Sequence, residues 1–269
     1  MKLGYIDYLN CYPFYYHMFE HTPVNGVEVF SRYPSDLNRM MTEGELDMSP
    51  ISAATYSLIQ DRAVLLSDFC LSSIGYVGSV ILRSRLPIEE LDQKKVGLTS
   101  ASHTSVLLLK MLLKSYYNVE PEYVLTKPNP SMDGLDAVLM IGNEAMLPSS
   151  TPVSFSYDLG ELWLRKTGFP VVFAVFAVRE EIIEKCSEEI KAVIKSYRAS
   201  IECLEKEVQR VVEAAQNKYP DITYDVQGYY ETCLQFKFSD GLKQALQFYY
   251  DKAFEMGLFE EKVTIRYFD

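Results

Sequence analysis

Apolar and polar positions along the chain alternate between two periods. Short apolar runs, typical of buried strands, are followed by stretches in which apolar residues recur every three or four positions, as on one face of a helix. Clear examples are the strand-like Val96-Gly97-Leu98, the helix-like spacing of Val106, Leu109 and Leu113, and the continuous apolar run 171–178. The repeated alternation of strands and helices predicts an α/β fold with mostly parallel sheets.

The same pattern predicts two lobes. The alternation of strands and helices starts again at Lys95, and from Arg179 onward the pattern becomes helical. We therefore expect the chain to cross twice between lobes, with residues 1–86 and 178–269 forming one discontinuous lobe and residues 87–177 forming the other. Two lobes that are linked twice enclose a hinged cleft, where small ligands usually bind.

The segment 99–105 carries the densest group of polar side chains at a predicted helix start. It reads Thr-Ser-Ala-Ser-His-Thr-Ser and contains five hydroxyls. The first turn of a helix has unpaired N–H groups and a partial positive charge, which suits a carboxylate or phosphate. Because one N-cap needs only one hydroxyl, the excess favours a ligand, and Ser102, Thr104 and Ser105 are predicted to bind it. His103 is either a donor to the anion or simply exposed.

Polar residues also stand in three other loops that follow a strand and precede a helix. They are Asn10, Ser52 and Asn143. Each one alone is typical of a cap or turn, but such loops converge at the carboxyl ends of strands in open α/β sheets, where ligands bind. Their recurrence predicts one common site. Ser79 and Gly142 complete the predicted substrate-binding residues.

The composition excludes several classes of function. The formal net charge of −11 argues against a nucleic-acid or anionic-membrane surface, so an anionic ligand must be held by local dipoles and hydroxyls. The five cysteines are odd in number and lack C-x-x-C pairs, which favours a reducing compartment over a disulfide framework or zinc site. The sequence shows neither an apolar signal core nor an 18-residue apolar span, so we expect a cytoplasmic protein.

No familiar catalytic motif is present. The sequence lacks a phosphate-binding G-x-x-x-x-G-K-[ST], an H-E-x-x-H and a G-x-S-x-G, and it offers no metal-spaced set of carboxylates. Of the three histidines, His17 and His21 are interpreted as packing or surface residues, and Asp158 and Glu144 as residues that complement helix starts. The residues alone therefore predict a two-lobed, anion-binding α/β protein without an obvious base.

Six segments, in order over residues 3–179, resemble motifs of the chorismate dehydratase family, the first enzymes of the futalosine route to menaquinone. They are IDYLNCYP (6–13), GELDMSPIS (44–52), SHTSV (102–106), AVLMIG (137–142), YDLGELW (157–163) and TGFPVVFA (167–174). The resemblance implies a type II periplasmic-binding-protein-like fold used as an enzyme, a carbon–oxygen lyase (hydro-lyase) that converts chorismate to 3-[(1-carboxyvinyl)oxy]benzoate and water. It implies chorismate as the small-molecule substrate, no cofactor and no metal.

Within this resemblance, Asn10 and Asn143 are the predicted catalytic residues. Two positions depart from the family: dehydratases often have Asp at Asn143 and Trp at Phe176. Because no side chain in the motifs is a convincing base, our hypothesis is that the enolpyruvyl carboxylate of the substrate removes the ring proton.

Two alternatives remain. One is the sister enzyme, 1,4-dihydroxy-6-naphthoate synthase, which shares the fold and characteristically has a His-Glu pair where this chain has Asn143-Glu144. The other is a non-catalytic small-anion-binding protein. Asn143 and the loop around Asn10 favour the dehydratase.

Overall fold

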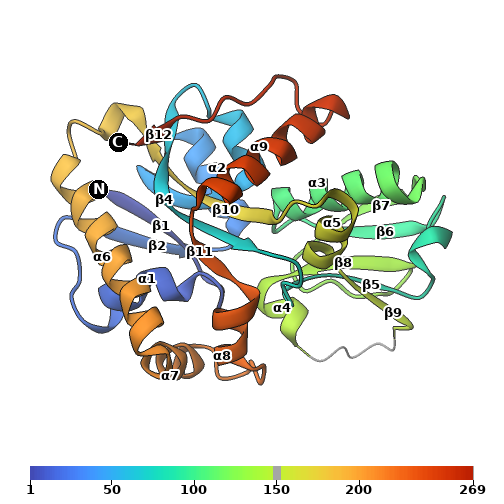
Figure 1. The fold of residues 1–269 in the computed structure, drawn as a ribbon, viewed down its shortest axis with the longest axis horizontal. Helices are drawn as coiled ribbons and strands as arrows, with labels where there is room; N and C mark the ends of the chain where they lie inside the picture. The colour runs from blue at the N-terminus through green and yellow to red at the C-terminus, as the bar shows by residue number, and fades with distance from the viewer. Residues whose placement is uncertain (148–152, 269) are drawn as a thin grey trace.

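The computed structural model describes residues 1–147 and 153–268 and has two lobes, each built on one β-sheet (Figure 1). In the larger lobe the strand order is β11-β4-β10-β3-β1-β2, with β12 beside β4, and in the smaller lobe it is β7-β6-β8-β5-β9. The larger sheet comprises β1 (Lys2–Ile6), β2 (Glu28–Arg32), β3 (Met48–Ser52), β4 (Ala63–Ser73), β10 (Val171–Arg179), β11 (Gln235–Lys237) and β12 (Tyr267–Phe268). The smaller sheet comprises β5 (Val80–Ser84), β6 (Lys95–Thr99), β7 (Glu122–Thr126), β8 (Ala137–Ile141) and β9 (Phe155–Asp158).

Helices cover both sheets. Those of the larger lobe are α1 (Tyr12–Glu20), α2 (Pro34–Glu43), α6 (Ser187–Lys206), α7 (Val208–Lys218) and α8 (Val226–Gly228), with short 3-10 turns at Ala53–Leu58 and Glu180–Ile182 and a π-helical turn at Tyr229–Cys233. Those of the smaller lobe are α3 (His103–Leu112), α4 (Gly142–Met146) and α5 (Leu159–Thr167), with a 3-10 turn at Ile88–Glu90 and a π-helical turn at Leu113–Tyr117. No helix in the described ranges is both long enough and apolar enough to span a bilayer.

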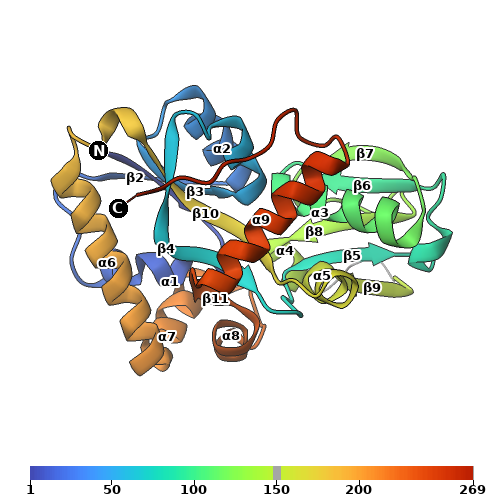
Figure 2. The same ribbon diagram turned by 45° about the horizontal axis from the view of Figure 1, so that its top comes forward.

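The final helix, α9 (Asp240–Glu255), joins the two lobes across their junction (Figure 2). Two consecutive tyrosines do this through their hydroxyls. Tyr249 donates to the carbonyl of Thr104 in the smaller lobe at 3.0 Å, and Tyr250 donates to the carbonyl of Ala53 in the larger lobe at 2.8 Å. Both tyrosines are buried, so α9 braces the two lobes on either side of the cleft.

The chain changes sheets earlier than the sequence predicts. It leaves the larger sheet after β4 and enters the smaller one at β5, and it returns at β10. The sheet boundaries therefore lie at residues 74–79 and 159–170, whereas the predicted lobes 1–86 plus 178–269 and 87–177 place β5 in the wrong sheet and divide β10. Apolar runs predict that a segment is a strand, but they do not reveal which sheet it joins.

Both sheets are mixed, which differs from the expected mostly parallel arrangement. β1 runs parallel to β2 and β3, and β6 runs parallel to β7 and β8. However, β10 is antiparallel to β3 and β4, and β5 is antiparallel to β8 and β9. β11 is also antiparallel to β4. The antiparallel pairs therefore include the strands on both sides of each crossing and one strand of the C-terminal segment.

Two further elements differ from the pattern. Ser52, which the sequence placed in a loop before a helix, is the last residue of strand β3, and the segment 49–52 pairs with β10 despite Pro50. Apolar residues recur at helical spacing from Ile190 to Val212, but this stretch forms two helices, because α6 ends at Lys206 and α7 begins at Val208. Apolar spacing continues across the break, so periodicity alone did not mark it.

Candidate functional site

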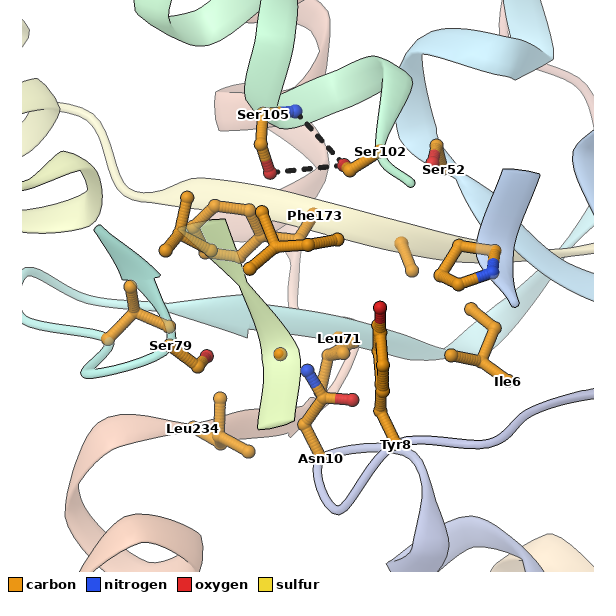
Figure 3. A pocket seen from close by; sticks show the side chains of 16 residues that line it. Ile6, Tyr8, Asn10, Ser52, Leu71, Ser79, Ser102, Ser105, Phe173 and Leu234 are labelled. Atoms are coloured by element: carbon orange, nitrogen blue, oxygen red, sulfur yellow. Dashed lines mark hydrogen bonds between the residues drawn. The ribbon is translucent and has the colours of Figure 1, made fainter. Parts of the chain in front are cut away.

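A cavity lies between the lobes, and its empty volume is about 490 Å³ when the space open to solvent is included. Small ligands bind preferentially at such junctions between two parts of a fold. The lining residues come from both sheets and from the C-terminal segment (Figure 3). They are Ile6, Tyr8, Asn10, Pro34, Ser52, Leu71, Val77, Ser79, Val80, Ser102, Ser105, Ile141, Gly142, Phe173, Ala174 and Leu234.

Six of the eight predicted site residues line this cavity: Asn10, Ser52, Ser79, Ser102, Ser105 and Gly142. Thr104 and Asn143 do not. None of the lining residues named above is charged, so polar contact is provided by hydroxyls, one side-chain amide and backbone groups. Among the residues that the structure describes, no group of three or more His, Cys, Asp or Glu side chains could hold a metal ion.

The N-terminus of α3 opens onto the cavity through Ser102 and Ser105. Ser102 is the N-cap, and its Oγ accepts a hydrogen bond from the backbone N–H of Ser105 at 3.2 Å. The Ser102 hydroxyl in turn donates to Ser105 Oγ at 3.1 Å. The Ser105 hydroxyl therefore accepts its hydrogen bond from Ser102, and its own proton is available to a ligand. The positive end of the helix dipole favours an anion here.

Thr104 has a structural role instead. Its side chain is fully buried, its hydroxyl donates to the carbonyl of Phe173 at 2.9 Å, and it accepts from the backbone N–H of Ala54 at 3.1 Å. The adjacent His103 contacts Thr55, with 3.4 Å between Nδ1 and Oγ1, and burial lowers the pKa of its imidazole. Both residues therefore connect α3 to the larger lobe, and neither reaches the cavity.

Asn143 and Glu144 hold the N-terminal loop that carries Asn10. Asn143 Oδ1 accepts from the backbone N–H of Leu9 at 2.8 Å. Glu144 accepts from the Tyr8 hydroxyl at 3.3 Å and from the backbone N–H of Asn129 at 2.8 Å. Burial raises the pKa of the Glu144 carboxyl. An aspartate at position 143 could accept the same bond from Leu9, so this departure from the family pattern preserves the contact.

Gly142 makes room for the Tyr8 ring. Its φ is +57°, and a Cβ built there would lie 2.6 Å from Tyr8 Cδ2. Only glycine combines that backbone conformation with so close an approach. Phe176, the other departure, is fully buried and packs on Phe14 with 4.5 Å between ring centroids. It belongs to the core and does not line the cavity.

Asn10 lines the cavity and carries a buried acceptor without a partner in the part of the chain that the structure describes. Within the described ranges, its Oδ1 is buried and has no hydrogen-bond partner. A buried polar atom without a partner is costly, and native structures leave few of them.

Ser52 is oriented by a residue that sequence reasoning missed. Asn38 of α2 accepts from the backbone N–H of Ser52 at 2.9 Å and donates to Ser52 Oγ at 3.0 Å. Asn38 is 8% exposed. It lies on the buried face of α2 together with Leu37 and Met41. A polar residue on an otherwise apolar helix face was the sequence signal that could have identified Asn38.

Asp158 caps two segments at once. Its carboxylate accepts from the backbone N–H of Glu161 at 3.0 Å, which confirms the predicted helix cap. It also accepts from the N–H of Gly78 at 2.7 Å and of Val77 at 3.1 Å. These residues form the turn immediately before Ser79, so Asp158 fixes the position of Ser79 at the cavity.

Solved structures with similar folds support this architecture. A protein from Archaeoglobus fulgidus superimposes with a TM-score of 0.76 at 20% identity, over 96% of this chain and 97% of that chain. The periplasmic aliphatic sulphonate binding protein from Escherichia coli gives a TM-score of 0.69 at 12% identity, over 100% of this chain and 92% of that one. The predicted periplasmic-binding-protein-like fold is therefore confirmed.

Sequence comparison identifies the family. A chorismate dehydratase from Thermus thermophilus is 33% identical over 196 residues, which cover 66% of this chain and 70% of that protein. A 1,4-dihydroxy-6-naphtoate synthase from the same organism is 26% identical over 165 residues, 61% of this chain and 59% of that protein. The family model described as menaquinone biosynthesis matches residues 1–255. As its motifs predicted, the chain belongs to this menaquinone-biosynthesis family.

Proposed function

We propose that this protein is a chorismate dehydratase, a hydro-lyase that converts chorismate to 3-[(1-carboxyvinyl)oxy]benzoate and water in menaquinone biosynthesis. The observation that carries the proposal is the 33% identity to the Thermus thermophilus chorismate dehydratase. The uncharged, hydroxyl-lined cavity is consistent with it. We expect the enzyme to act in the cytoplasm, in keeping with its five free cysteines.

Chorismate is a dianion, and the cavity offers separate places for its carboxylates. Ser105 and the N-terminus of α3 belong to the smaller lobe, whereas Ser52, oriented by Asn38, belongs to the larger lobe. In this proposal each hydroxyl donates to one carboxylate. Hydrogen bonds to charged groups are worth about 1.5–3 kcal/mol, so an anion can be held here without a lysine or arginine.

The reaction removes a proton from one ring carbon and the hydroxyl from its neighbour, and the ring becomes aromatic. Tyr8 is the one ionisable side chain among the described lining residues. Because burial raises the pKa of its phenol, it stays protonated near neutral pH and cannot act as the base. We therefore assign proton removal to the enolpyruvyl carboxylate of the substrate itself. The protein then contributes mainly orientation in a largely dry cleft, which can supply several kcal/mol of a barrier. Asn10 would orient the leaving hydroxyl or the enolpyruvyl group through its amide.

The sister naphthoate synthase is less well supported. The position at which it has histidine is Asn143 here, and Asn143 contacts the backbone of Leu9 outside the cavity. Mass spectrometry of separate incubations with chorismate and with a cyclic futalosine distinguishes the candidates. The proposal expects loss of water from chorismate only. Conversion of the futalosine would favour the synthase, and binding without conversion would favour a non-catalytic protein.

Substitutions at Ser105 and Thr104 should have different effects, the first on affinity for chorismate and the second on the stability of the fold. Ser105→Ala removes a donor to a carboxylate, so the Kd for chorismate should rise about tenfold with little change in stability. Thr104→Val leaves Phe173 O and Ala54 N without their partner, which should lower the free energy of unfolding by about 1–3 kcal/mol. Calorimetry and urea denaturation measure the two effects. Unchanged affinity in Ser105→Ala would make Ser105 a capping residue only.

A further inference from the structure

The C-terminal segment carries none of the family motifs, but it contacts two segments that contribute residues to the cavity. These contacts are made by two consecutive tyrosines of the π-helical turn Tyr229–Cys233. The Tyr229 hydroxyl donates to Ser79 Oγ at 2.7 Å, and the Tyr230 hydroxyl donates to the carbonyl of Leu9 at 2.8 Å. Both rings are buried. Leu234, the residue after this turn, lies at the same end of the cavity as Ser79 and Asn10 (Figure 3).

Ser79 is fixed at its backbone as well as at its side chain. The turn before it is held by Asp158, and its carbonyl accepts from the backbone N–H of Gly142 at 2.8 Å. Its side chain is 1% exposed and lines the cavity. The remaining freedom is rotation of the hydroxyl about the Cα–Cβ bond, and the bond from Tyr229 removes it.

The direction of that bond decides what Ser79 can do. A serine hydroxyl has one proton to donate and two lone pairs. Because the Tyr229 phenol donates, Ser79 Oγ accepts there and its own proton is left for a ligand. Burial raises the pKa of Tyr229, an effect opposed by the nearby Ser79 hydroxyl and Asn10 amide, so the phenol stays protonated and remains a donor near neutral pH.

We propose that Tyr229 is a positioning residue that presents the Ser79 hydroxyl to the substrate as a hydrogen-bond donor. This inference rests on the proposed dehydratase function for its kinetic test. It assigns a role in the site to the C-terminal part of the chain. Tyr229 itself does not touch the cavity, since it is absent from its lining.

A double-mutant cycle tests whether Tyr229 acts through Ser79. Tyr229→Phe removes only the hydroxyl. We expect kcat/KM for chorismate to fall about tenfold, which corresponds to an increase of about 1.4 kcal/mol in the activation free energy. In a Ser79→Ala background the same change should alter kcat/KM by less than about twofold. Tyr197→Phe is the matched control, because Tyr197 is also fully buried and donates to another hydroxyl, that of Tyr15, at 2.6 Å. It should stay within about twofold of the parent.

A crystal structure of the ligand-free Tyr229→Phe protein gives a second readout that does not depend on activity. Ser79 Oγ should occupy more than one rotamer in this variant and a single rotamer in the parent and in Tyr197→Phe. Equal losses from Tyr229→Phe in both backgrounds, or an unchanged single Ser79 rotamer, would overturn the proposal. If the parent protein does not convert chorismate, the proposed function fails, and the rotamer of Ser79 alone decides this inference.

Discussion

Replacing Asn10 by aspartate is expected to lower turnover of chorismate by more than about a hundredfold while the protein stays folded. The substitution is nearly isosteric, but it exchanges the amide donor for a negative charge beside a dianionic substrate. Two like charges about 4 Å apart repel by about 4 kcal/mol at an effective dielectric constant of 20, and each 1.36 kcal/mol is a factor of ten in rate. Steady-state kinetics and circular dichroism measure the two quantities.

Asn10→Ala is the matched variant without added charge. It should also lose turnover, though less than Asn10→Asp, because the cavity loses the amide that carries the buried, unpartnered Oδ1. A fully active Asn10→Asp with a new pH optimum would mean that position 10 serves as a base. Full activity of both variants with unchanged pH dependence would remove Asn10 from the site.

Asp158→Ala is expected to lower the free energy of unfolding by about 3 kcal/mol and to impair turnover as well. Asp158 is 6% exposed, and its carboxylate accepts from the backbone N–H groups of Val77, Gly78 and Glu161. Each buried donor left without a partner costs about 1–3 kcal/mol, partly offset because burial of the carboxylate itself is unfavourable, as its raised pKa indicates. The turn that carries Ser79 loses its anchor, so the cavity is affected too.

Ser239→Ala provides the comparison for an ordinary helix cap. Ser239 Oγ accepts from the backbone N–H of Leu242 at the start of α9, at 3.4 Å, and losing such a cap costs about 1 kcal/mol. Urea denaturation of both variants measures the difference. Equal losses would mean that Asp158 is no more than the cap of α5 and that the turn before Ser79 does not depend on it.

Local patterns predicted the elements that build the site, because periodicity and helix-start chemistry are local. Strand β6, helix α3 and the buried strand β10 lie where the apolar spacing placed them. The partners of β5 and β10 were not predictable in this way, since pairing is decided by packing between segments far apart in the sequence. The lobe boundaries were misplaced for that reason.

The sequence predicted which loops form the site, but it did not predict which side chains of those loops point into the cavity. Ser102 and Ser105 line the cavity, whereas Thr104, between them, binds Phe173 and Ala54. A helix turns by about 100° per residue, so neighbours in one hydroxyl-rich segment face different partners. Tyr229 was missed because it contacts Ser79 across 150 positions of sequence and no local signal marks such a contact.

Proton NMR of chorismate incubated with the purified, chelator-treated protein, with no cofactor added, tests the central claim most directly. Dehydration predicts that the ring signals of chorismate disappear while aromatic signals of 3-[(1-carboxyvinyl)oxy]benzoate rise in equal amount, and that Asn10→Asp slows both changes together. A chorismate spectrum that stays unchanged under these conditions, with the protein folded and the substrate saturating, would contradict the account.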